Sequence, residues 1–152
     1  MLGVFSALEV AASGLSAERV RMNTIASNLA NARTTRTEEG GPYKRRDVVL
    51  QATQVDTPKF ADALAHAMPG TQDEDQSWGV AAEEIVVSND EPVLVYDPGH
   101  PDADETGHVA MPNVSGIKEM VNMMGAARAY EAGTTVMKTV SDMAEHALRI
   151  GR

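Results

Sequence analysis

Residues 1–32, MLGVFSALEVAASGLSAERVRMNTIASNLANA, decide the fold, because apolar side chains recur in this stretch every seven positions. The first row consists of Leu8, Leu15, Met22 and Leu29. The second row consists of Val4, Ala11, Ile25 and Ala32, and only Glu18 interrupts it. Two adjacent rows with this spacing predict a long amphipathic helix with one buried stripe.

The other end of the chain repeats this rhythm. Its rows are Met123, Tyr130, Met137 and Ala144; Ala126, Gly133, Val140 and Ala147; and a flanking row of Met120, Ala127, Thr134, Ser141 and Leu148. Helices over 2–32 and 116–150 would run roughly 45 Å and 50 Å, too long for a small middle domain to cover. We therefore expect the two stripes to pack on each other, while any remaining apolar surface contacts neighbouring molecules or stays exposed. The candidate assembly interface is Leu8, Leu15, Met22, Leu29, Met123, Tyr130, Met137, Val140 and Leu148.

Composition and charge restrict the function classes. The 152 residues carry a formal charge of −9 and 4% aromatic residues, and they contain no cysteine. Residues 52–112 hold one Lys/Arg against thirteen Asp/Glu, whereas both ends are near neutral. An acidic middle argues against binding to nucleic acid, and no apolar run is long enough for direct membrane insertion. The apolar start lacks the basic region of a secretory signal, so we expect no signal cleavage.

The stretch between the helices predicts a small β domain, so the expected fold class is α+β. We expect an N-terminal helix in 1–33, an extended loop and β segment in 34–58, an acidic middle β domain in 59–112 with a mobile loop near 69–79, and a C-terminal helix in 113–152. Short β runs stand at 48–50, 80–87, 93–96 and 108–111, and a short helix is expected in 58–68. We expect 80–87 and 93–96 to form a hairpin around the turn at 88–92. Ser115 is the expected N-cap of the last helix.

Several short motifs resemble bacterial flagellar rod and hook proteins, and in particular their proximal-rod subtype. The motif residues are Ser27, Asn28, Asn31, Thr34, Gly41, Pro42, Tyr43, Tyr96, Asp97, Pro98, Gly99, Pro112, Asn113, Arg128 and Glu131. Together the motifs cover most of the chain except roughly 52–79.

The resemblance implies a non-enzymatic subunit of the proximal rod, without a cofactor or a metal. It implies polymerisation through the terminal helices into the drive shaft that transmits torque for motility. The implied partners are copies of the chain, other flagellar rod proteins and the flagellar type III export apparatus. The implied location is the basal body in the periplasmic space, reached without a cleaved signal peptide, and the terminal helices are expected to be poorly ordered before assembly.

Two other function classes remain open at this point. Acidic and histidine side chains gather in 97–108, namely Asp97, His100, Asp102, Asp104 and His108, which could form the site of a metal-dependent periplasmic enzyme. The prolines and the glycine between them favour a solvated turn instead. A generic coiled-coil adaptor is the third class, and it would have ordered terminal helices in the isolated chain.

Overall fold

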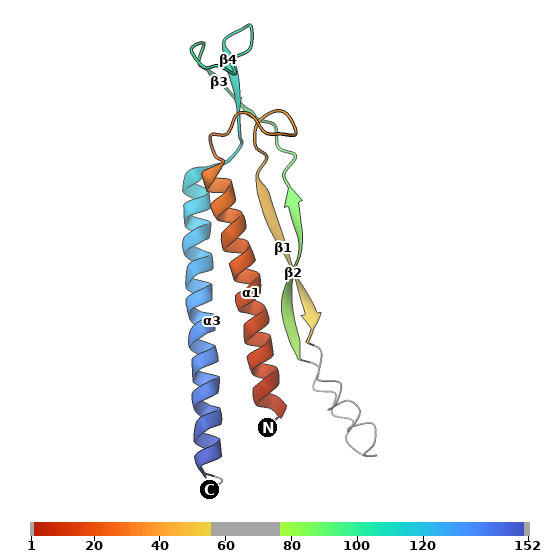
Figure 1. The fold of residues 1–152 in the computed structure, drawn as a ribbon, viewed down its shortest axis with the longest axis vertical. Coiled ribbons are helices and arrows are strands. Elements are labelled where there is room, and N and C mark those ends of the chain that lie inside the picture. Colours follow the sequence, from red (N-terminus) through yellow and green to blue (C-terminus); the bar gives the residue numbers. More distant parts are fainter. Residues whose placement is uncertain (1, 56–76, 151–152) are drawn as a thin grey trace.

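The molecule is long and narrow, and its described residues form a helix near each end of the chain with four strands between the helices (Figure 1). The computed structural model describes residues 2–55 and 77–150. Helix α1 (Leu2–Ala30) and helix α3 (Gly116–Ile150) run antiparallel, and both termini lie at the lower end in Figure 1. The strands are β1 (Arg46–Gln54), β2 (Trp78–Val87), β3 (Val93–Tyr96) and β4 (His108–Met111). The predicted α+β class and the pairing of the two helices are confirmed.

The two helices pack along a seam made of one stripe from each helix. On α3 the less exposed residues follow a heptad spacing: Glu119, Met123, Ala126, Tyr130, Gly133, Met137, Val140 and Ala144. Leu15 of α1 lies directly on Gly133, because a Cβ atom at Gly133 would be 2.8 Å from Leu15 Cδ2. The absence of a side chain at residue 133 therefore allows the two backbones to approach closely.

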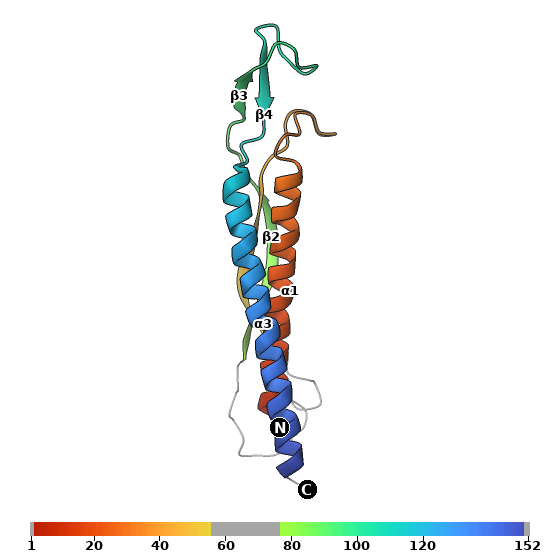
Figure 2. The same ribbon diagram turned by 90° about the vertical axis from the view of Figure 1, so that its left-hand side faces the viewer.

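The antiparallel ribbon of β1 and β2 lies along the side of α1 that faces away from α3, so α1 forms the middle layer (Figure 1, Figure 2). A register shift between Val49 and Leu50 marks a β-bulge, which increases the twist of such a ribbon. Ser13 fastens the ribbon to α1, because its hydroxyl accepts a hydrogen bond from Val80 N at 3.1 Å. Gly79 is buried at this contact, where a Cβ atom would be 2.6 Å from Ser13 Oγ.

Strands β3 and β4 form a second antiparallel hairpin beyond the upper ends of the helices (Figure 1). The expected hairpin of 80–87 with 93–96 is therefore wrong. Strand β2 pairs with β1 across 56–76, and Ser88 N continues that ladder by donating to Arg45 O at 2.8 Å. The hydroxyl of Ser88 also binds Asp90, and Pro92 lacks the N–H that a tight hairpin ladder would use. The chain consequently passes from one sheet to the other.

Helix α1 ends at Ala30, before the expected bound of 33, and β1 covers Arg46–Gln54, a longer span than the run expected at 48–50. Helix α3 begins as expected after Ser115, whose carbonyl accepts the first helical bond, from Glu119 N at 3.0 Å. The loop expected at 69–79 is wrong at its end, because Trp78 and Gly79 pair with Gln54 and Thr53 in the ribbon. The short helix expected in 58–68 lies outside the described residues. None of the described helices combines the length and hydrophobicity needed to span a bilayer.

Candidate functional site

A buried polar cluster joins the C-terminal end of α1, the first turn of α3 and the start of β1. We call Asn28, Tyr43, Arg45 and Glu119 the polar junction. Asn28 is 1% exposed, and its amide oxygen accepts hydrogen bonds from Tyr43 OH and Arg46 N, both at 2.9 Å. Its amide nitrogen donates to Arg46 O at 2.7 Å and to Glu119 Oε2 at 3.1 Å. One side chain thus satisfies groups from three elements.

Glu119 is the charged member at the centre of the junction, with 1% of its surface exposed. Arg45 Nε donates to Glu119 Oε1 at 3.0 Å, and the same guanidinium pairs with Asp47 Oδ2 at 3.0 Å. Burial lowers the pKa of Arg45, but the hydrogen bonds that its guanidinium donates to the Glu119 and Asp47 carboxylates outweigh burial and raise this pKa above the ordinary value. A buried carboxylate requires such a partner, so Arg45 and Glu119 stabilise the fold as a pair.

The loop that follows α1 is folded back onto the junction by its own hydrogen bonds. Asn31 Nδ2 donates to Ser27 O at 2.9 Å, Thr34 Oγ1 donates to Asn31 Oδ1 at 3.1 Å, and Tyr43 N donates to Thr34 O at 3.0 Å. Residues 40 and 41 are glycines with φ of 87° and 78°, values that favour glycine. Five motif residues, from Ser27 to Tyr43, therefore build one structural unit, and Gly41 and Pro42 shape the turn that leads into it.

The motif at 96–99 lies at the outer end of the β3–β4 hairpin. Tyr96 is 68% exposed and contacts the His108 ring edge-on at 5.3 Å between centroids. Gly107 is buried beneath Tyr96, where a Cβ atom would be 2.9 Å from the Tyr96 ring. Asp97 begins a turn, because its carbonyl accepts a bond from His100 N at 3.2 Å. Pro98 and Gly99 complete this exposed turn.

The acidic and histidine side chains of 97–108 form hydrogen bonds within the loop that joins β3 to β4. Asp104 Oδ1 accepts hydrogen bonds from Thr106 Oγ1, Thr106 N and His108 N at 2.7 to 2.9 Å. The Thr106 hydroxyl is the main reason that the pKa of Asp104 lies below its ordinary value. Within residues 2–55 and 77–150, no three His, Asp or Glu side chains lie close enough to hold a metal ion. The geometry therefore gives the metal-enzyme hypothesis no site.

The residues of the candidate assembly interface divide into two groups. Leu8, Leu15, Met22, Met123, Tyr130, Met137 and Val140 lie half-buried in the helical seam. Leu29 is 38% exposed near Gly116, and Leu148 is 59% exposed. The structure thus uses most of these side chains within one molecule, and their role between molecules stays a prediction.

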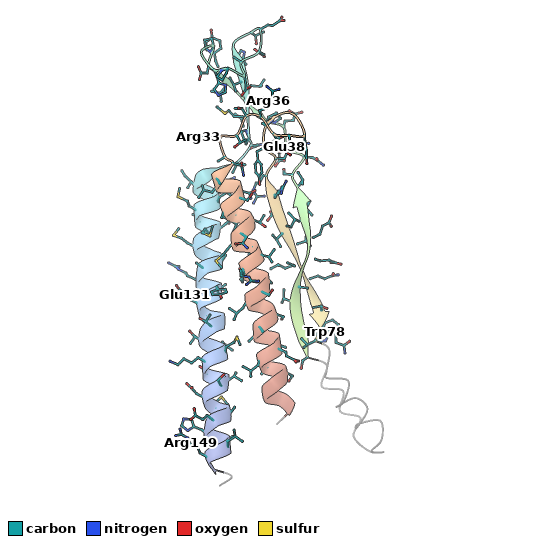
Figure 3. The ribbon with its side chains drawn as sticks, in the orientation of Figure 1. Arg33, Arg36, Glu38, Trp78, Glu131 and Arg149 are labelled. Atoms are coloured by element: carbon teal, nitrogen blue, oxygen red, sulfur yellow. The ribbon has the colours of Figure 1, made fainter. Side chains whose placement is uncertain are left out.

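The last motif residues are spread along the approach to α3 and its middle. Pro112 is buried, and Asn113 Nδ2 donates to Glu91 O at 3.3 Å, which links the segment after β4 to the segment before β3. Arg128 and Glu131 are both exposed, and Glu131 lies on the side of α3 that faces away from α1 (Figure 3). Among the described residues, neither side chain forms an ion pair.

Glu119 and Arg45 are the junction residues that the sequence did not single out as a site. A signal existed, because Glu119 occupies the same heptad row as Ala126 and Gly133, where a charge needs a buried partner. The basic run at 44–46 offered that partner. Arg45 lies 74 residues before Glu119 in the chain, so the sequence did not show that the two side chains pair.

Apolar surface remains exposed after the seam and the ribbon have formed. On α3, Ile117, Val121 and Met124 are 74%, 57% and 55% exposed and lie on one face, opposite the seam. Near the other end of α3, Met143 and Leu148 are 64% and 59% exposed. At the lower end of the ribbon, Trp78 is 58% exposed (Figure 3). Such surface is typical of a protein that contacts other chains.

Comparison with known proteins identifies relatives over the whole length of the chain. A family model described as "Flagella basal body rod protein" matches residues 8–36, and one described as "Flagellar basal body rod FlgEFG protein C-terminal" matches residues 105–150. The flagellar basal-body rod protein FlgC of Borreliella burgdorferi is 39% identical, over 98% of each chain. FlgC of Bacillus subtilis is 40% identical over 97% of this chain and 98% of its own. FlgC of Salmonella typhimurium is 37% identical over 99% and 100%, respectively.

Proposed function

The chain belongs to the FlgC family of flagellar basal-body rod proteins, and from this premise we propose that it assembles into the proximal part of the rod through its terminal helices. It is a structural subunit of the flagellar basal-body rod and not an enzyme. Its partners are other flagellar rod components. The proposal concerns which surfaces of the molecule contact those partners.

The exposed apolar face of α3 is the observation that carries the proposal. Ile117, Val121 and Met124 bury little surface within the molecule, although each could contribute about 1.5–3 kcal/mol if fully buried. A neighbouring subunit is the simplest source of that burial. Seam residues such as Leu15 and Tyr130 would then support the interface indirectly, by holding the two helices in a fixed relation.

A contact between different faces of identical or related subunits generates an open helical filament when its rotation does not close into a ring. A rod that grows by addition at its tip needs such a contact. We place the assembled subunit in the periplasmic part of the basal body, reached through the flagellar type III export apparatus without cleavage of a signal peptide. In this proposal the subunit neither binds nucleic acid nor inserts directly into the membrane.

The substitution Leu148→Asp tests the role of the terminal helices without disturbing the seam. Leu148 is 59% exposed, so the isolated chain should keep its helical circular dichroism. Cells that carry only this variant should lose rod assembly and swimming, because a charge would be buried in a subunit contact. Lys138→Gln, at another exposed position of α3, serves as the control and should swim normally.

Normal basal bodies with the Leu148→Asp variant would contradict assembly through the end of α3. Loss of swimming together with loss of helical structure would instead assign Leu148 to folding. Electron microscopy of purified basal bodies and circular dichroism of the purified chain separate these outcomes.

A further inference from the structure

A groove of about 340 Å³ opens where α1, α3 and the ribbon meet, and its surface is almost entirely apolar. Small residues of α1 line it, among them Gly14 and Ala17, while α3 contributes Val136 and the ribbon contributes Leu50 and Val80. These last three side chains remain 51%, 37% and 36% exposed. The groove is therefore open to solvent and lined by apolar atoms that lack full cover.

Glu18 is the charged residue in this groove, and it is incompletely paired. Its Oε2 atom is buried without a hydrogen-bond partner among the described residues. Its other oxygen lies 3.8 Å from Arg21 Nη1, which is beyond hydrogen-bond distance, and the Arg21 side chain is 47% exposed. Burying a carboxylate oxygen without a donor costs free energy. A donor from outside the molecule would remove that cost.

Arg128 provides a matching group on the opposite face of α3. It follows Ile117, Val121 and Met124 at helical spacing, and we call these four residues the outer stripe. Leu15 lies on Gly133 and the two helices run antiparallel, so Glu18 is level with about residue 130, and Arg128 lies about 3 Å further along the α3 axis. Two copies placed side by side with little axial displacement would bring Arg128 of one close to Glu18 of the other.

We infer that the groove around Glu18 receives the outer stripe of a second copy of this chain, with Arg128 of that copy pairing with Glu18. The inference rests on the proposed assembly function and names its contacting residues. The apolar neighbours of Arg128 match the apolar walls of the groove, and its planar guanidinium can donate to the unpaired oxygen. Since the groove and the stripe lie on different faces, the contact is heterologous and can repeat along a rod.

Charge reversal tests the pairing in cells that carry only the variant chain. Glu18→Arg and Arg128→Glu should each lower the yield of rod-containing basal bodies about tenfold or more, because each places like charges in a desolvated contact. The double variant should restore the yield to within about twofold, since it re-forms the pair with exchanged signs. Lys138→Glu is the control for a charge reversal elsewhere on α3 and should have little effect.

Chemical cross-linking reads the same contact directly, because the chain has no native cysteine. With Glu18→Cys and Arg128→Cys in one chain, a short bismaleimide should link subunits in purified basal bodies, and Glu18→Cys with Lys138→Cys should not. A link between subunits doubles the mass of the denatured chain, whereas a link within one subunit does not, so the product of doubled mass reports the intermolecular contact.

Failure of the double variant to recover assembly, together with absence of cross-linking, would overturn the pairing. Normal assembly of both single variants would also overturn it, as would recovery only through a change in a different rod protein. If Leu148→Asp still abolishes assembly in those cases, the proposed function stands and only this contact is wrong.

Discussion

The two ends of the helical pair differ in how many of their side chains are buried or hydrogen-bonded within one molecule. At the upper end, the polar junction buries Asn28 and Glu119 to 1% exposure and supplies hydrogen bonds from three elements. At the lower end, residues 145–149 of α3 are all exposed, and Met143 and Leu148 are 64% and 59% exposed. This difference supports the proposal that neighbouring subunits complete the far end of α3.

Removal of Asn28 should have the largest effect on the isolated chain. Asn28→Ala deletes four hydrogen bonds: two to the Arg46 backbone, one to Tyr43 OH and one to the buried Glu119 Oε2. The free energy of unfolding should fall by about 3–5 kcal/mol, measured by urea denaturation. Asn31→Ala is the matched control, because its side chain makes local bonds at the helix end. A smaller loss for Asn28→Ala than for Asn31→Ala would remove the distinction between junction and periphery.

Two glycines in α3 test how tightly the middle of the seam is packed. In Gly133→Ala the new methyl would stand 2.8 Å from Leu15 Cδ2, so we expect destabilisation of about 1–3 kcal/mol. Gly125→Ala has open space around the new methyl and should stabilise the helix by up to about 1 kcal/mol. Thermal unfolding of the two variants should therefore shift in opposite directions. Equal shifts would mean that the helices are not in close contact at this level.

Substitution at the far end of α3 should leave the isolated chain nearly unchanged. Met143→Gln and Leu148→Gln replace side chains that are 64% and 59% exposed, so the unfolding free energy should change by less than about 0.5 kcal/mol. The same changes should weaken assembly, scored as swimming speed and basal-body yield. A large loss of monomer stability would show that this end already packs within the molecule.

The smallest effect is expected for a substitution in the loop of the β3–β4 hairpin, where a single pKa should change. Thr106→Val removes the main hydrogen bond that lowers the pKa of Asp104, so that pKa should rise toward its ordinary value of 3.8 in an NMR titration. Because the folded pKa is lowered, the Asp104 contribution to the hairpin is present above the unfolded pKa and is lost as pH falls through the folded value. An unchanged pKa in the variant would contradict this assignment.

The heptad rows predicted the helices and their pairing, because apolar residues at helical spacing within a short stretch of sequence are enough to indicate a buried helical stripe. Strand pairing was not predictable in the same way. The run at 80–87 could pair with either flanking strand, and the choice of β1 depends on its packing against α1 at Ser13 and Gly79. Local sequence also identified 93–96 and 108–111 as strands, but it did not show that they form a sheet of their own.

In the candidate site, too, residues of short local motifs were predicted, and residues whose partners lie far away in the chain were not. Asn28, Asn31 and Tyr43 belong to short motifs and were predicted. Glu119 was not, because its partners Asn28 and Arg45 lie 91 and 74 residues away in the chain. Leu148 was assigned to the interface by heptad counting, and it is exposed within one molecule because α1 does not reach it: Leu15 lies on Gly133, so residue 148 lies beyond the start of α1 at Leu2.

Hydrogen–deuterium exchange on the purified, unassembled chain reports local opening along each helix. We expect strong protection of amides in 22–30 and 117–127, around the polar junction, and rapid exchange in 138–150. We also expect 138–150 to become protected in purified basal bodies. Uniform protection of α3 in the isolated chain would contradict the claim that neighbouring subunits complete its far end.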